Sequence, residues 1–160
     1  MAHEIERKFL IDLDRLGKLT GGSSIKQGYI STKDLTTVRI RIKGEQGFLT
    51  LKGENRGASR LEFEYPIPVT DAEEILHTLC SRPLIEKNRY EVKHNNWLWE
   101  IDIFEGDNSG LVIAELELET EDAVVDLPDW VRVEVTGDPR YYNANLLNYP
   151  YRCWSADERQ

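Results

Sequence analysis

Apolar and charged residues alternate one by one along several short segments of this chain. The clearest of these segments are residues 4–10, 38–43, 48–52, 61–65, 98–103 and 113–119. Because successive side chains of a β-strand point to opposite faces, this period of two predicts strands with one apolar and one charged face. Weaker candidates bring the count to about eight or nine strands, enough to close a barrel. They are residues 26–31, 85–93 and 131–136.

Glycine-containing segments between the predicted strands indicate an antiparallel order. Residues 44–47, Gly-Glu-Gln-Gly, separate two alternating segments, and residues 105–110 contain two further glycines. Glycine adopts the positive φ of a tight hairpin turn without steric cost. Both segments are therefore predicted to join neighbouring antiparallel strands.

Few helices are predicted. Thr70 and Glu73 have the spacing of a capping box ahead of apolar residues at helical spacing. A second short helix is expected after Thr120, and a third from about Arg140 to Leu147. The sequence thus predicts a mainly β fold whose few helices cover only part of the barrel's outside.

The charged face of each predicted strand carries side chains of nearly one sign. The acidic rows are Glu4 with Glu6, Glu62 with Glu64, and Glu115 with Glu117 and Glu119. The basic row is Arg39, Arg41 and Lys43. A sheet packed on helices with its charges in water is the alternative for any single strand. Solvated faces usually mix the two signs, so the segregation favours a charged interior.

Rows of like charge have a direct chemical meaning. Side chains two residues apart on a strand lie about 7 Å apart and repel each other, so a row needs counter-charges or a bound ion. Carboxylates are suitable ligands for Mg²⁺ or Mn²⁺, while arginine and lysine bind phosphate oxygens. Burying the rows without water would cost on the order of several kcal/mol per unpaired ion. The pattern predicts a wet lumen that binds a metal and a phosphate compound.

Length, charge and cysteine content indicate which partners and which cellular compartment are expected for this chain. The chain has 160 residues and a formal net charge of -9, which argues against non-specific binding to nucleic acid or anionic membranes. Cys80 and Cys153 are far apart and lack CxxC spacing, so we expect reduced thiols. No segment has the apolar length of a signal peptide or a membrane span, so a cytoplasmic protein is expected. We expect one domain over residues 1–150 and a tail over residues 151–160.

Taken in order, the charged motifs resemble those of the CYTH superfamily, the triphosphate tunnel metalloenzymes. This family includes class IV adenylyl cyclases, thiamine triphosphatases and inorganic tripolyphosphatases. Its most specific motif is E-x-E-x-K, which matches residues 4–8. The later motifs are the R-x-R of Arg39 and Arg41, the strand ending at Lys52, the E-x-E of Glu62 and Glu64, the K-x-R of Lys87 and Arg89, the Asp102 strand, and the E-x-E of Glu115 and Glu117.

The resemblance implies a closed eight-stranded antiparallel β-barrel, the triphosphate tunnel, with a C-terminal helix that plugs or covers one end. The implied substrate-binding residues are Lys8, Arg39, Arg41, Lys52, Lys87 and Arg89. The implied metal ligands are Glu4, Glu6, Glu62, Glu64, Glu115 and Glu117, with Asp102 as a supporting ligand. Glu4, Glu6 and Lys8 are the implied catalytic residues, and Lys8 would contact phosphate and position or deprotonate the attacking water. Tyr142 and Ala144 depart from the family's usual plug motif.

The expected activity is hydrolysis of inorganic tripolyphosphate or a related organic triphosphate with Mg²⁺ or Mn²⁺. One alternative within the same fold is a class IV-type adenylyl cyclase that forms cyclic AMP from ATP. Others are a non-catalytic module that binds polyphosphate or nucleotides, and a purely structural charged sheet. We expect a small-molecule triphosphate as partner, neither nucleic acid nor membrane, and a monomer or homodimer.

Overall fold

The computed structural model describes residues 3–160, which form nine strands, two α-helices and four short 3₁₀ helices. In chain order these are β1 (His3–Ile11), α1 (Leu13–Leu16), β2 (Ser23–Ile30), β3 (Thr37–Lys43), β4 (Gln46–Lys52), β5 (Ser59–Ile67), α2 (Val69–Thr78), β6 (Ile85–His94), β7 (Trp97–Phe104), η1 (Gly106–Asn108), β8 (Val112–Glu117), β9 (Val131–Glu134), η2 (Pro139–Tyr141), η3 (Asn143–Leu147) and η4 (Tyr151–Cys153). No helix in this described part is long and apolar enough to cross a membrane. Both cysteines are free, as predicted.

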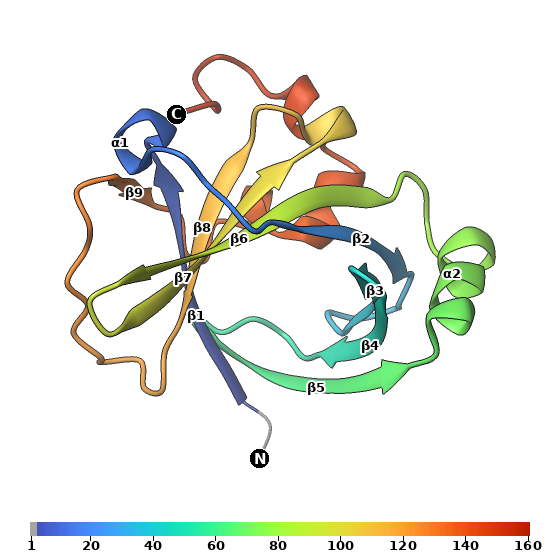
Figure 1. Cartoon of the computed structure of the whole chain (residues 1–160). Helices are drawn as coiled ribbons and strands as arrows, with labels where there is room; N and C mark the ends of the chain where they lie inside the picture. Colours follow the sequence, from blue (N-terminus) through green and yellow to red (C-terminus); the bar gives the residue numbers. More distant parts are fainter. Residues whose placement is uncertain (1–2) are drawn as a thin grey trace.

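Eight antiparallel strands close into a barrel, which confirms the predicted fold class. Around the ring the order is β1-β5-β4-β3-β2-β6-β7-β8, and β8 returns to β1 (Figure 1). The ring closes through β1, because its first residues pair with β5 while Glu6 to Leu10 pair with β8. The ninth strand, β9, pairs with the far end of β1 at the edge of the sheet.

The two predicted turns are confirmed. Lys43 pairs with Gln46, so Gly44 and Glu45 form a two-residue turn between β3 and β4. Gly44 has φ +60°, the left-handed conformation that such hairpin turns require. The second segment contains η1 and joins β7 to β8.

Two details of the first two predicted helices are wrong. The helix expected near Thr70 exists as α2, which packs outside β2, β3 and β4, but Pro68 is its N-cap and no side chain caps it. The helix expected after Thr120 is absent from the described chain, where residues 118–130 are turns and irregular backbone. Ala123 and Val125 of this segment pack on the outside of the barrel. We attribute the missing helix to this packing and to Pro128, which cannot donate a helical hydrogen bond.

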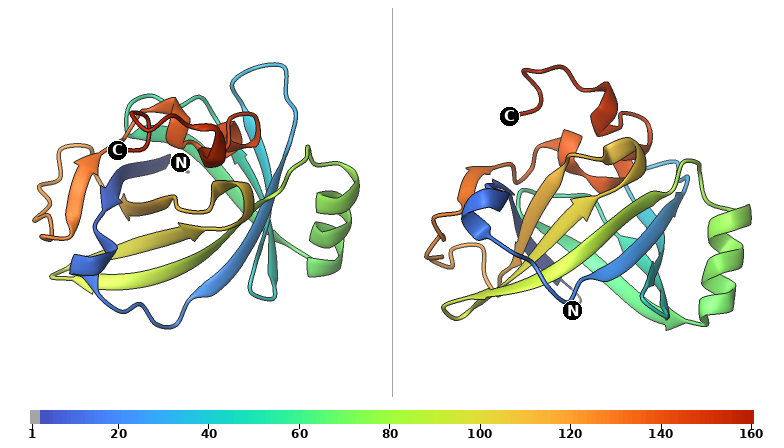
Figure 2. Two further views of the ribbon diagram at one scale, coloured as in Figure 1. Left: turned by 90° about the horizontal axis from the view of Figure 1, so that it is seen from above. Right: turned by 45° about the horizontal axis from the view of Figure 1, so that its top comes forward.

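An apolar cluster closes one end of the barrel. Strands contribute inward-facing Leu10, Tyr29, Ile85, Phe104 and Ile113. These side chains pack against Tyr141 of η2, Leu146 of η3 and Trp154, which follows η4. The C-terminal 3₁₀ helices lie over this end of the barrel (Figure 2). The predicted third helix is therefore two 3₁₀ helices, η2 and η3, and Trp154, in the expected tail, is 4% exposed. This packing leaves the rest of the barrel interior to polar side chains.

Candidate active site

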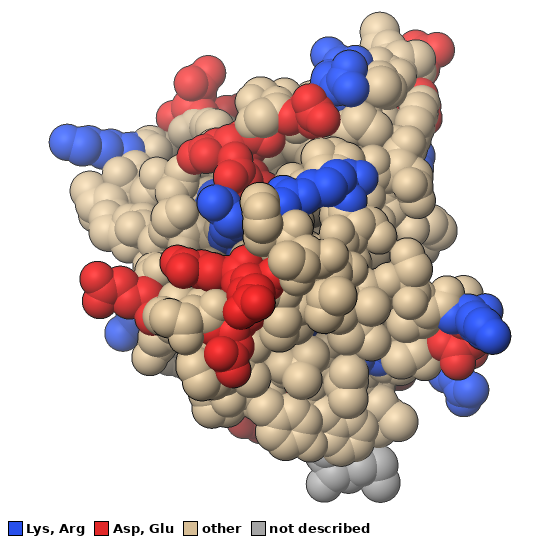
Figure 3. All heavy atoms as spheres, turned by 90° about the vertical axis from the view of Figure 1, so that its right-hand side faces the viewer, with Lys and Arg blue, Asp and Glu red and all other residues tan. Residues whose placement is uncertain are grey.

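Charged side chains surround a cavity of about 980 Å³ inside the barrel. All the site residues predicted from the sequence line it, except Lys87 and Asp102. Acidic and basic side chains lie side by side around a hollow in the surface shown in Figure 3. The inward direction of the charged faces, which period two alone left open, is thus confirmed.

Strand order places the two signs on opposite halves of the barrel wall. The acidic half consists of four neighbouring strands, β7, β8, β1 and β5. The basic half consists of β4, β3, β2 and β6, although β2 itself contributes the neutral Gln27 and Tyr29. Lys8 of β1 and Arg60 of β5 add positive charge to the acidic half. Motifs far apart in the sequence therefore become two continuous facing surfaces.

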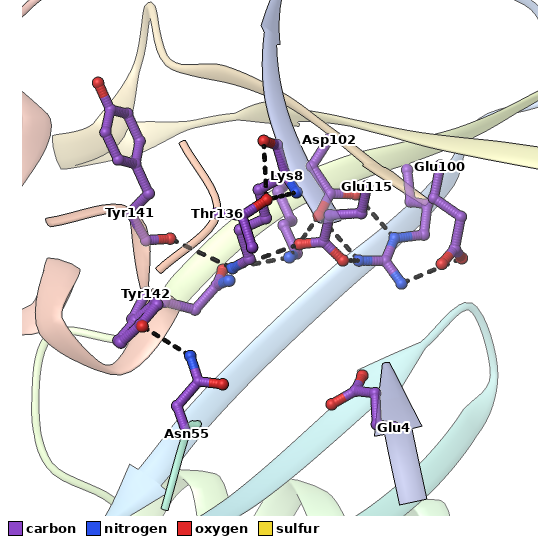
Figure 4. A network of polar contacts seen from close by, with 12 residues as sticks. Glu4, Lys8, Asn55, Glu100, Asp102, Glu115, Thr136, Tyr141 and Tyr142 are labelled. Carbon is purple, nitrogen blue, oxygen red and sulfur yellow. Dashed lines mark hydrogen bonds and ion pairs between the residues drawn. The ribbon is translucent and has the colours of Figure 1, made fainter. Parts of the chain in front are cut away.

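Lys8 occupies a crowded position between the acidic wall and the C-terminal segment. Its Nζ lies 3.7 Å from Glu115 Oε1 and donates to the carbonyl oxygen of Tyr141 at 3.4 Å (Figure 4). Burial alone lowers the pKa of Lys8, but the charges of Glu115 and Glu6 outweigh it and raise the pKa above its usual value. Lys8 is therefore an ammonium donor at neutral pH.

The pKa values of the glutamates of the acidic wall are shifted in different directions. Lys52 Nζ donates to Glu4 at 2.9 and 3.2 Å, and this interaction overcomes burial and lowers the pKa of Glu4. Burial, followed by the charges of Glu115 and Glu4, raises the pKa of Glu6 well above its usual value. The pKa of Glu115 is instead held well below its usual value, because Lys8 and Arg89 outweigh its burial. Glu6 and Glu115 are thus a pair of neighbouring carboxyls with opposite pKa shifts.

Asp102 holds two basic side chains beneath the cavity wall. Arg89 donates to both of its carboxylate oxygens, at 2.7 and 2.8 Å, and Lys87 Nζ donates at 2.6 Å. Lys87 also contacts Asn143 at 3.1 Å and lies over the ring of Phe104. Burial lowers the pKa of Lys87 to about 7, although Asp102 opposes this shift. Arg89 reaches the cavity, whereas Lys87 and Asp102 are 1% and 0% exposed and support it from behind.

The basic wall contains a buried donor without a partner. Arg39 donates from Nη2 to Thr50 and Glu64, but its buried Nε has no hydrogen-bond partner in the described structure. Arg41 donates to Gln27 at 2.9 Å. Burial, then Arg39 and Arg89, lower the pKa of Arg41 to about 10. An anion in the cavity would reduce the repulsion among these guanidinium groups.

The donor set fits a hard divalent cation, although it is not assembled around one. Within residues 3–160, no group of three His, Cys, Asp or Glu side chains is arranged so that it could hold a metal ion. The cavity nevertheless carries carboxylates on three neighbouring strands, from Glu62, Glu4 with Glu6, and Glu115 with Glu117. Carboxylate oxygens are the ligands that Mg²⁺ and Mn²⁺ prefer. A cation would also relieve the repulsion between Glu6 and Glu115.

Several cavity residues were not identified from the sequence. Glu100 lies two residues before Asp102 on β7, so the alternation that selected Asp102 could have selected it too. Tyr29 lies in the weak strand candidate, and nothing in its local sequence distinguishes it from core. Asn55 and Tyr142 line the cavity from a loop and from the C-terminal segment, where no periodic pattern exists.

A profile of the CYTH domain family matches residues 2–142 of this chain. Two similar curated proteins are both named inorganic triphosphatase. The one from Acetivibrio thermocellus is 50% identical over 152 residues, which cover 95% of this chain and 97% of that protein. The one from Nitrosomonas europaea is 40% identical over 147 residues, which cover 89% of this chain and 95% of that protein.

The fold is similar to solved structures as well. The crystal structure of an inorganic triphosphatase matches with a TM-score of 0.65 and 38% sequence identity, covering 92% of this chain and 95% of that chain. The ordered motifs and the closed tunnel agree with these sequence matches. Since the family profile covers most of its length, this chain belongs to the CYTH domain family.

Proposed function

We propose that this protein hydrolyses inorganic tripolyphosphate to pyrophosphate and orthophosphate, with Mg²⁺ or Mn²⁺ as its cofactor. The observation that carries this proposal is the cavity of about 980 Å³ with an acidic half facing a basic half. The similar proteins named inorganic triphosphatase support the choice of substrate. Phosphoryl transfer depends mainly on positioning and charge neutralisation, which are what such a cavity supplies.

The basic residues would hold the phosphate chain. Arg39, Arg41, Lys52 and Arg89 line the cavity and would donate to phosphate oxygens. Asp102 would fix the guanidinium plane of Arg89 through its two hydrogen bonds, and Lys87 would balance the buried charge of Asp102. These buried contacts preorganise the site before the substrate binds.

Lys8 would act as a donor to the terminal phosphoryl group. Its raised pKa keeps it protonated at neutral pH, which favours binding the phosphoryl oxygens and positioning water over accepting a proton. Hydrolysis breaks the bond between the terminal phosphorus and its bridging oxygen, and water supplies the new oxygen on that phosphorus. The departing pyrophosphate would stay bound to the basic wall until release.

The glutamates would hold the metal. Glu4, Glu6, Glu115 and Glu117 are the proposed ligands, while Glu62 and Glu64 would support the site from β5. When bound, a divalent cation neutralises phosphate charge and activates water. Glu4 would hold the cation, and Lys52, which donates to Glu4 in this structure, would donate to phosphate.

The test is release of orthophosphate from tripolyphosphate in the presence of each metal. Glu4→Gln and Glu6→Gln are expected to lower the rate by at least about 100-fold, because each removes a negatively charged ligand. Glu119→Gln is the matched control, since Glu119 belongs to the same sequence row as Glu115 but is exposed and does not line the cavity. Full activity in both variants would sink the proposal. Cyclic AMP formation from ATP, or tight binding without turnover, would instead identify a cyclase or a binding module.

A further inference from the structure

The barrel wall is interrupted beside Lys8. β1 pairs with β5 only as far as Ile5, after which Glu6 N donates to Ala58 O, and the pairing with β9 begins at Phe9. Between these points the wall is formed by the β4–β5 loop and the chain that follows β9. A small second cavity of about 20 Å³ lies in this gap.

Tyr142 and Asn55 close the gap. Asn55 Nδ2 donates to Tyr142 Oη at 2.6 Å, and Lys8 Nζ lies 5.7 Å from the centre of the Tyr142 ring. Both residues line the main cavity and the small one, as Lys8 and Arg60 also do, and Figure 4 shows the Tyr142 hydroxyl facing the Asn55 amide. The contact joins residues that are 87 positions apart in the chain.

The opposite end of the main cavity is different. Its lining includes Lys43 and Gln46 beside the β3–β4 turn, at the end of β3 and β4 remote from the β4–β5 loop, and Gln46 is exposed. A phosphate chain can therefore extend towards solvent at that end. At the Lys8 end it would meet an uncharged ring and amide that are hydrogen-bonded to each other and separate it from Arg60, which lines the small cavity.

We propose that the Asn55–Tyr142 pair is an end stop that determines which phosphoryl group lies beside Lys8. The proposal rests on the proposed function. With the stop in place, a linear polyphosphate enters until its terminal phosphoryl group reaches Tyr142, so only the terminal bond is cleaved. Without it, the chain can slide past Lys8, and an internal phosphoryl group occupies the reacting position.

Tetrapolyphosphate distinguishes the two cases by its products. Cleavage of the terminal bond by water yields orthophosphate and tripolyphosphate, whereas cleavage of the central bond by water yields two pyrophosphates. We expect wild type to cleave the terminal bond, and Tyr142→Ala to raise the ratio of central to terminal cleavage by about tenfold or more. Initial products would be resolved by phosphorus NMR.

Two smaller substitutions distinguish loss of the end stop from a general loss of structure. Asn55→Ala and Tyr142→Phe both remove the same hydrogen bond and keep the ring, so both should raise the ratio by a similar, smaller amount of about threefold. Tyr149→Phe is the matched control, because it removes a tyrosine hydrogen bond to Glu158 away from the cavity and should leave the ratio unchanged. Asn55→Ala keeps the test valid if Tyr142→Ala does not fold.

The outcomes are distinct. If wild type releases phosphate from tripolyphosphate but neither Tyr142→Ala nor Asn55→Ala changes the cleavage ratio, the end stop is wrong and the proposed function stands. The same conclusion follows if wild type already cleaves the central bond freely. If wild type releases no phosphate from tripolyphosphate with either metal, both proposals fail.

Discussion

The β6–β7–β8 side of the cavity and the β3–β4–β5 side carry similar charges but hold them differently. On the first side, Arg89, Asp102 and Glu115 are each at most 8% exposed and are joined by short ion pairs. On the second side, Glu62 and Glu64 are more exposed, and the carboxylate of Glu64 accepts from Arg39 at 3.2 Å. We call the first side the fixed side, because buried ion pairs hold its carboxylates Asp102 and Glu115, and the second the open side, because its carboxylates Glu62 and Glu64 are partly exposed.

The outer faces of the two sides differ in the same way. Outside β7 and β8, Trp99 is completely buried against Phe9 and Trp130. Outside β5, Phe63 and Tyr65 are 41% and 52% exposed. The fixed charges thus stand on a wall packed from both sides, while the open charges stand on a wall with solvent behind it. Preorganisation of this site therefore depends on packing outside the barrel as well as on ion pairs inside it.

The largest expected loss of stability follows a substitution on the fixed side. Asp102→Asn would leave Lys87 and Arg89 without their buried counter-charge, so the free energy of unfolding should fall by about 3–5 kcal/mol. Glu64→Gln is the comparison on the open side and should cost about 1 kcal/mol or less, because the Glu64 side chain is 40% exposed. Urea denaturation measures both. Equal losses would mean that the two sides are not distinct.

A second test compares arginines on the two sides. Arg89→Lys should lower kcat for tripolyphosphate by about 100-fold, because lysine cannot keep both hydrogen bonds to Asp102 and also present a fixed donor. Arg41→Lys should lower kcat by about tenfold, since Arg41 has one hydrogen bond to Gln27 and is free to reorient. Steady-state kinetics would measure both. A larger loss for Arg41→Lys would reverse the assignment of the fixed side.

The smallest expected loss of stability follows a substitution outside the barrel, where β9 pairs with β1. Arg7 donates to both carboxylate oxygens of Glu134, at 2.9 and 2.7 Å, and these hydrogen bonds lower the pKa of Glu134. Glu134→Gln should lower the free energy of unfolding by about 1 kcal/mol at pH 7. A lowered carboxyl pKa stabilises the fold above the usual pKa of glutamate, about 4.3, and this contribution is lost as the pH falls through the folded-state pKa.

The pH series provides the check on that contribution. The difference in unfolding free energy between wild type and Glu134→Gln should shrink as the pH is lowered from 7 through this range. Glu45→Gln, at an exposed position in the β3–β4 turn, is the control and should show little difference at any pH. A difference that persists unchanged at low pH would show that the Arg7–Glu134 ion pair is not its source.

Most of the wall of the site could be predicted from the chain itself. Period two identified the strands, and the single sign of each charged face identified Glu4, Arg39 and Glu115 as residues of one lumen. Both signals are local, because a strand displays alternate residues on one face wherever it lies in the fold. The turn at Gly44 is local for the same reason. The helix expected after Thr120 failed because tertiary packing overrides weak helix propensity.

The roles of individual side chains depended on contacts between distant segments. Lys87 and Asp102 have the same alternation as the residues of the wall, yet the structure buries them under Arg89 and Asn143. Asn55 shows no pattern, the sequence marks Tyr142 only as a departure from the family's plug motif, and the two meet only when the C-terminal segment crosses the end of the barrel. The alternation along the chain indicates which faces of the strands are charged. Which of those charges reach the cavity depends on the fold, because burial and pairing are set by the neighbours that folding brings together.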